Sequence, residues 1–178
     1  MKRIKFKTIY KTKMADTVTP VGLYLRFRDQ YANTLLLESS DYHSKEESFS
    51  FIAIDPVVSI KAEDHHLRFS HKGIELENQK IGRNFNAIFE GYSQSIDLEC
   101  PEELKPFNGL YGYTTYDAVQ YFENISLDVA QAPSSIPLMQ YSFYRFIIAI
   151  NHFNDEMTLI ENIEEGTVSR IKEIQSII

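Results

Sequence analysis

Two apolar runs separated by a short polar loop constrain the fold of this chain more than any other feature. Leu35–Leu37 is a continuous apolar run, typical of a strand that is buried on both faces. After the loop, Phe49–Ile54 is a second strand pattern, and Asp55-Pro56 is expected to break it, because proline disfavours helix in the residue before it. The pattern therefore predicts two strands whose apolar residues 35–37 and 51–54 are among the most buried in the chain.

Polar side chains lie where the first of these runs ends. Glu38 and Ser39 follow directly, and Ser50 lies in the second strand. If the two strands are neighbours, Glu38, Ser39 and Ser50 come close together. A carboxylate can bind an ammonium group, while hydroxyl or backbone N–H groups can bind a carboxylate, so the cluster suits a small zwitterion. The alternative is that the Glu-Ser pair is only the solvated start of a turn.

Strand patterns outnumber helical patterns in the rest of the chain. Helices are expected over 19–31, where Thr19 is the cap and Pro20 the first helical residue, over 84–95, and from Thr114 to Glu123. Short strands are expected at 57–62, 67–69, 74–76, 140–151 and 157–160. The predicted fold class is α+β, with a largely antiparallel, sandwich-like core and helices packed outside it.

Glycines and aromatic residues mark one further segment, from Phe107 to Val119. Gly109 and Gly112 permit close approach of the backbone, and the tyrosines between them and after them are expected to pack against the sheet. The segment lacks the glycine spacing of a phosphate-binding loop. Nucleotide binding is therefore not predicted.

Charge and composition exclude several classes of function. Six of the 18 basic residues lie within residues 1–13, but Ile4 and Phe6 alternate with them, which predicts a half-buried strand with a lysine-rich outer face that protects a sheet edge. The formal net charge is −7, so a nucleic-acid partner is not expected. No apolar run is long enough to cross a membrane, and no secretory signal is present. Cys100 is the only cysteine, which excludes an intrachain disulfide and favours a cytoplasmic location.

No metal or nucleophilic site is predicted. His65, His66 and His71 lack the spacing of zinc ligands and are interpreted as surface turn residues. The final segment, 166–178, places Val168, Ile171, Ile174 and Ile178 on one helical face. This stripe is expected to be exposed and to lack a partner, so the chain is interpreted as an amino-terminal fragment that can self-associate.

Three segments carry a resemblance to a known family. Residues 34–56 contain LLLESSDYHSKEESFSFIAIDP, residues 107–119 are FNGLYGYTTYDAV, and residues 136–162 are IPLMQYSFYRFIIAINHFNDEMTLIEN. In this order they resemble the amino-terminal region of anthranilate synthase component I, one of the chorismate-utilising enzymes. Asn108 stands where the family has the first glycine of a Gly-Gly pair.

The resemblance implies a function that the residues alone do not. Anthranilate synthase component I is a lyase that converts chorismate and glutamine-derived ammonia into anthranilate and pyruvate, with Mg²⁺ and with a glutamine amidotransferase, component II. In the family the catalytic and metal-binding residues lie in the carboxyl-terminal part. Residues 1–178 are therefore expected to form the regulatory part, to hold no cofactor and to be inactive alone.

The resemblance also implies an allosteric site for L-tryptophan. The family's Leu-Glu-Ser motif contacts this inhibitor, and it corresponds here to Leu37, Glu38 and Ser39, with Phe49 and Ser50 on the strand across the loop. Some family members have lysine at the position of Phe49. Two alternatives remain open: component I of aminodeoxychorismate synthase, from the folate pathway, and a free-standing amino-acid-binding module.

Overall fold

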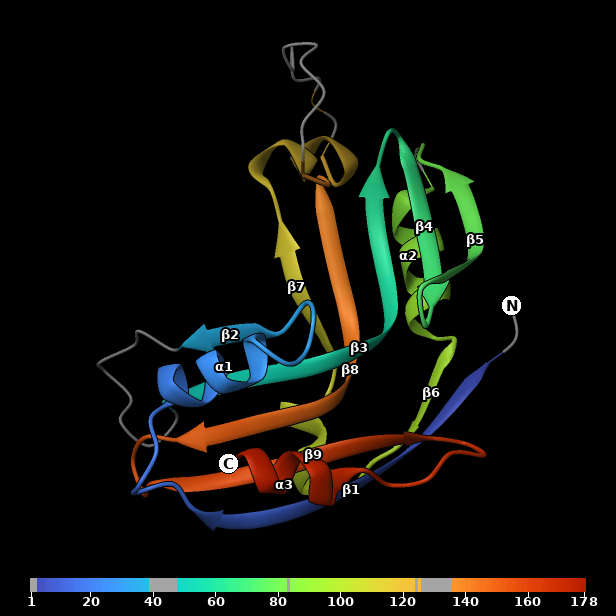
Figure 1. Cartoon of the computed structure of the whole chain (residues 1–178). Coiled ribbons are helices and arrows are strands. Elements are labelled where there is room, and N and C mark those ends of the chain that lie inside the picture. Colours follow the sequence, from blue (N-terminus) through green and yellow to red (C-terminus); the bar gives the residue numbers. More distant parts are fainter. Residues whose placement is uncertain (1–2, 39–47, 83, 124, 126–135) are drawn as a thin grey trace. The chain divides into compact units, whose positions relative to one another are not determined.

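The computed structural model describes residues 3–38, 48–82, 84–123, 125 and 136–178 (Figure 1). The chain divides into two compact units. One is built mainly from Val57–Asp97 and Leu110–Phe143, and the other mainly from Ile4–Pro56, Leu98–Gly109 and Tyr144–Ile178. The two longest strands each contribute to both units.

Antiparallel strands dominate both units. Hydrogen bonds link them in the order β5 (Ile74–Lys80), β4 (His66–His71), β3 (Phe49–Glu63), β8 (Met139–Asn151), β9 (Glu156–Glu164), β1 (Ile4–Met14) and β6 (Ile96–Glu99). In addition, β2 (Leu35–Glu38) pairs with β3, and β7 (Leu110–Thr114) pairs with β8. The predicted mixture of largely antiparallel strands and a few helices is confirmed, whereas the sandwich-like packing stays a prediction.

The second unit packs two helices against its sheet. Thr19 caps α1 (Pro20–Arg28) as predicted, because its hydroxyl accepts a hydrogen bond of 3.1 Å from the backbone N–H of Gly22. The helix ends at Arg28, three residues earlier than predicted. The buried core residues of this unit come from both helices, from strands β3, β8 and β9, and from Ala15, which follows β1; they are Ala15, Leu23, Phe27, Ile52, Ile54, Phe146, Ile148, Ile150, Met157, Leu159, Ile171 and Ile174.

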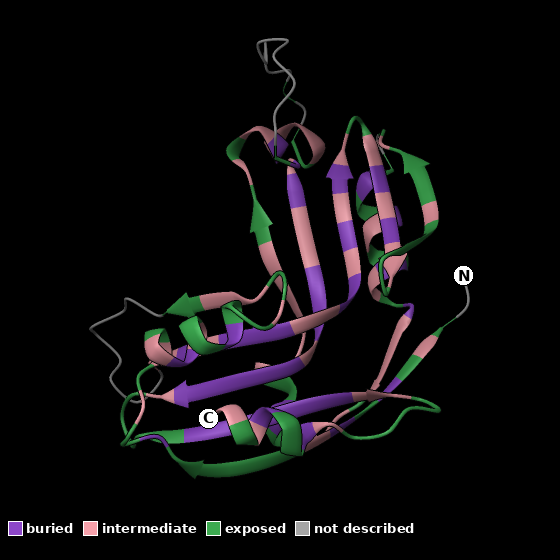
Figure 2. Cartoon of the chain, in the orientation of Figure 1, coloured by how far each residue is buried: buried purple, intermediate pink, exposed green. Residues whose placement is uncertain are grey.

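The burial of the two apolar runs differs from one run to the other. Of the predicted buried run 51–54, Ile52–Ile54 are fully buried (Figure 2), whereas Phe51 is only partly buried, contrary to the prediction. The prediction for Leu35–Leu37 is wrong, because Leu35 and Leu36 are only partly buried and the exposed fraction of Leu37 is 39%. The strand β2 lies off the main strand order and pairs with β3, so a continuous apolar run here does not indicate a strand covered on both faces.

The predicted break at Asp55-Pro56 does not occur. Strand β3 continues from Phe49 to Glu63 through both residues. Asp55 instead adopts a left-handed backbone conformation, with φ at 62°, which aspartate tolerates better than most residues. The strand therefore passes through Asp55-Pro56 with an unusual backbone conformation at Asp55 and does not end there.

The apolar stripe near the end of the chain is not an exposed surface. Ile171 and Ile174, on α3 (Ile171–Ile177), belong to the buried core of the second unit, and Ile178 packs partly against it. Val168 is 78% exposed but precedes the helix. The prediction of an exposed stripe is thus wrong, because the unit's own sheet covers it.

The basic arm is the half-buried strand that its alternation predicted. In β1, Phe6 and Thr8 are buried while Lys5 and Lys7 are exposed. The strand does not form a sheet edge, since β1 lies between β9 and β6. The prediction that the lysines of β1 protect a sheet edge is therefore wrong where β6 pairs with β1.

The first unit packs α2 (Phe85–Ser93) against its strands. The rings of Phe69 on β4 and Tyr92 on α2 lie 5.2 Å apart, and both residues are buried. The helix predicted to begin at Thr114 is wrong: Thr114 ends β7, and a short 3-10 helix, Tyr116–Tyr121, follows without a side-chain cap. Tyr116 is 83% exposed and does not pack against the sheet, contrary to the prediction.

Gly112 in β7 meets the neighbouring strand closely, as its place in the sequence predicted. A Cβ atom at this position would overlap the backbone carbonyl of Gln140 and approach the Cα of Tyr141 to 2.7 Å. Gly112→Ala is expected to destabilise the protein by about 1–3 kcal/mol, because the backbone of β8 would have to move. Thermal unfolding measures this loss.

Gly109 provides the matched control, because the close approach predicted there does not occur. A Cβ atom there would meet nothing within 4 Å, so Gly109→Ala is expected to leave the free energy of unfolding nearly unchanged. Equal stability of the two variants would contradict the close approach at Gly112.

Candidate functional site

The ends of strands β2 and β3 bring two of the predicted site residues together. In the antiparallel register, Glu38 lies opposite Ser50 and Leu37 lies opposite Phe51. The expectation that Glu38 and Ser50 are neighbours is confirmed. Ser39 lies outside the described residues.

The four predicted site residues that the structure describes do not share one face of this two-stranded ribbon. Side chains alternate between faces along a strand, and directly opposed residues share a face. Ser50 is fully buried on the face of Ile52, which belongs to the core, and Glu38 is exposed on the same face. Phe49 and Leu37 therefore lie on the other face.

Aromatic side chains form the second face of the ribbon. The rings of Phe49 and Phe51 are stacked at 5.9 Å, and Phe107 lies 5.0 Å from Phe49 and 6.0 Å from Phe51. Phe107 comes from a 3-10 helix, Glu102–Phe107. Phe49 thus belongs to an aromatic cluster, on the face opposite Glu38 and Ser50.

His152 is a site residue that the sequence reasoning missed. Its Nε2 atom lies 2.7 Å from the hydroxyl oxygen of Ser50, and its backbone N–H donates to the carbonyl of Ser48 at 2.9 Å. His152 directly follows β8, and 102 positions separate it from Ser50 in sequence. The available signal was a histidine between a long strand pattern and the Asn154-Asp155 turn, but the pairing of β3 with β8 was not predicted.

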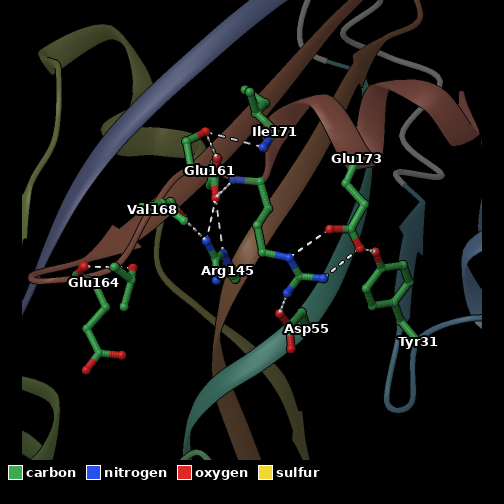
Figure 3. A network of polar contacts seen from close by, with 11 residues as sticks. Tyr31, Asp55, Arg145, Glu161, Glu164, Val168, Ile171 and Glu173 are labelled. Carbon is green, nitrogen blue, oxygen red and sulfur yellow. Dashed lines mark hydrogen bonds and ion pairs between the residues drawn. The ribbon is translucent and has the colours of Figure 1, made fainter.

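A second polar cluster surrounds Glu161, on β9. The side chain of Glu161 is fully buried and accepts hydrogen bonds from Arg145 at 2.9 and 3.1 Å, from the hydroxyl of Ser169 at 2.6 Å and from the backbone N–H of Arg170 at 2.8 Å (Figure 3). Arg145 also donates to the carbonyl of Val168 at 2.6 Å. The carboxylate thereby holds the segment that leads into α3.

Further charges extend this cluster toward solvent. Arg170 forms ion pairs with Glu173 at 2.6 Å and with Asp55 at 3.6 Å, and the hydroxyl of Tyr31 donates to Glu173 at 2.7 Å. The pKa of Glu173 is lowered to about 2, mainly by the hydrogen bond from Arg170 and secondly by the hydrogen bond from Tyr31. The pKa of Tyr31 is raised to about 12, mainly by burial and secondly by its hydrogen bond to Glu173. The charges of the cluster are paired with one another, which indicates a structural role.

The described residues contain neither a metal-binding cluster nor a membrane-spanning helix. No three or more His, Cys, Asp or Glu side chains gather there in a way that fits a metal ion, including the Mg²⁺ that the family resemblance implies. No helix in the described part of the chain has the length and hydrophobicity needed to cross a bilayer.

Comparison with known proteins identifies relatives that are named anthranilate synthase component 1. The sequence is 29% identical to anthranilate synthase component 1 of Lactococcus lactis subsp. lactis over 83% of the chain, and 32% identical to that of Pseudomonas putida over 62% of the chain. The matched parts make up 31% and 22% of these relatives and lie in their amino-terminal region. No family model matches the chain.

A solved structure shows the same fold. Anthranilate synthase component I from Streptococcus pneumoniae superposes with a TM-score of 0.51 at 20% identity, over 93% of this chain and 34% of that one. The chain therefore spans about a third or less of the relatives that it matches. In sequence and in fold it resembles the amino-terminal region of anthranilate synthase component I, as its three motifs predicted.

Proposed function

We propose that this chain acts as the regulatory amino-terminal region of an anthranilate synthase component I. In a whole enzyme of this kind, it would take part in the conversion of chorismate and glutamine-derived ammonia into anthranilate and pyruvate, for tryptophan biosynthesis. Mg²⁺ and the amidotransferase component II would be engaged outside the described residues. The chain alone is proposed to be inactive toward chorismate. The similarity to several curated enzymes of this name supports the proposal.

One observation carries the regulatory part of the proposal. The Leu-Glu-Ser segment, through which the chain resembles the family, ends β2 so that Glu38 lies directly opposite Ser50. A carboxylate beside a hydroxyl, next to the partly buried Leu36 and the buried Ile52, suits an amino acid with a large apolar side chain. We therefore assign L-tryptophan as the ligand.

The two faces of the ribbon would have different roles in binding. Glu38 would bind the ammonium group of the amino acid, and Ser39 would provide a hydroxyl group. Ser50 is fully buried and would act through its contact with His152. Leu37 and Phe49, on the opposite face, would act indirectly by holding the ribbon against Phe107. The ligand can change activity only if it binds two states of the enzyme with different affinities.

Ser39→Phe tests this assignment in a protein that joins the chain to the remaining part of one of its relatives. The joined enzyme is expected to form anthranilate and to be inhibited by L-tryptophan. The substitution is expected to relieve inhibition and to leave chorismate turnover largely intact, since a bulky ring would fill the inhibitor site. Inhibition that is unchanged in an active Ser39→Phe enzyme would contradict the regulatory role. If the joined protein does not fold, the 178-residue chain is titrated with L-tryptophan and followed by NMR. The Ser39→Phe chain is then expected to lose the tryptophan-induced shifts that the unmodified chain shows.

A further inference from the structure

His152 completes a row of three polar side chains across adjacent strands. Glu38 on β2 lies opposite Ser50 on β3, and the imidazole of His152, just after β8, lies 2.7 Å from the hydroxyl oxygen of Ser50. Because His152 contacts the side chain of Ser50, it lies on the face that Glu38 shares. The row thus presents a carboxylate, a hydroxyl and an imidazole in that order.

The backbone around His152 holds the imidazole in a defined place. Its N–H donates to the carbonyl of Ser48, which ties the turn after β8 to the start of β3. Within the turn, the side chain of Asn151 accepts from the N–H of Phe153 at 2.8 Å, and that of Asn154 accepts from the N–H of Glu156 at 3.1 Å. These side-chain bonds are of the kind that stabilise turns.

The contact between Ser50 and His152 leaves a hydrogen-bond donor on the imidazole. Because Ser50 is fully buried whereas His152 is exposed, a ligand can reach the imidazole but not the hydroxyl of Ser50. When the hydroxyl donates to Nε2, the imidazole N–H is on Nδ1. This N–H suits a carboxylate.

The spacing of the row suits the two charges of one amino acid. Neighbouring strands lie about 4.8 Å apart, so the backbones that carry Glu38 and His152 are separated by roughly 10 Å. Both side chains can extend toward a ligand that lies over Ser50. The ammonium group would then face Glu38, and the carboxylate would face His152.

We propose that His152 recognises the carboxylate of the amino acid bound at this site. The inference rests on the function proposed above and adds to it a residue that determines specificity. Glu38 and His152 together would select a zwitterion over an amine or an acid that carries the same apolar group.

The test is an NMR titration of the isotopically labelled 178-residue chain with three probes. L-tryptophan carries both charges, tryptamine lacks the carboxylate, and indole-3-propionate lacks the ammonium group. His152→Ala is expected to weaken L-tryptophan binding about tenfold or more, as for a lost hydrogen bond to a charged group, and to leave tryptamine binding unchanged. Glu38→Gln, the matched control, is expected to weaken tryptophan and tryptamine binding but not indole-3-propionate binding.

The outcomes separate this inference from the proposed function. Equal weakening of tryptophan and tryptamine binding by His152→Ala would mean that His152 only supports the fold, and would overturn the inference. Unchanged tryptophan binding in the His152→Ala variant would also overturn the inference, but the proposed function would stand. If the unmodified chain binds no L-tryptophan, the same titrations are made with the enzyme that joins the chain to the remaining part of a relative, and absence of tryptophan binding there would overturn both. Partial recovery of tryptophan binding in His152→Gln, which keeps a donor group, would support carboxylate recognition.

Discussion

Glu161→Ala is expected to lower the free energy of unfolding by about 3–5 kcal/mol, the range seen when one partner of a buried ion pair is removed. Glu161 is fully buried, and the exposed fraction of the Arg145 side chain is only 15%. Without the carboxylate, the guanidinium loses its counter-charge, and the hydroxyl of Ser169 and the N–H of Arg170 lose their acceptor. Urea unfolding followed by circular dichroism measures the loss.

Two further variants make this measurement specific to the buried pair. Glu165→Ala removes a carboxylate that is 73% exposed and lies 3.9 Å from Lys5, so it is expected to cost less than about 1 kcal/mol. The double variant Glu161→Leu with Arg145→Met is expected to be more stable than Glu161→Ala, because it removes both charges at once. If Glu161→Ala and Glu165→Ala were equally stable, the cluster would not hold α3 in the way described.

The elements of the fold that local patterns specify were the ones predicted well. The cap at Thr19, the strand that ends at Asn151 and the turn at Asn154-Asp155 each depend on residues close in sequence. Burial depends on partners far away in the chain. The run Leu35–Leu37 was therefore predicted to be buried although it pairs off the main strand order, and α3 was predicted to be exposed although its isoleucines enter the core.

In the candidate site, too, the features that depend on residues close in sequence were predictable, and those that depend on distant residues were not. The neighbours Glu38 and Ser50 follow from two strand patterns joined by one loop, which is a local feature. The alternation of faces that separates Phe49 from Ser50 could also have been derived from the two-residue period of a strand. The approach of His152 to Ser50 depends on the pairing of β3 with β8, which no pattern in one sequence specifies.

The affinity of the 178-residue chain for L-tryptophan is expected to be low. The chain spans 31% or less of the curated relatives compared above, and we expect the remaining part of such an enzyme to supply further contacts to the ligand. Each lost hydrogen bond to a charged group costs about 1.5–3 kcal/mol, so two lost bonds weaken binding by about a hundredfold or more. The chain alone should therefore bind at least that much more weakly than an enzyme that joins it to the remaining part of a relative.

The joined enzyme and the separate chain are compared by titration with L-tryptophan, and light scattering determines the mass of each protein. The scattering measurement is needed because a second copy of the chain could itself supply the missing contacts. Micromolar binding by a strictly monomeric chain would show that the site is complete within 178 residues. In that case, the polar partners of the ligand would have to come from this chain's own residues, and the argument from lost contacts would be wrong. Weak binding that becomes tight only in the joined enzyme would support a site completed by the remaining part.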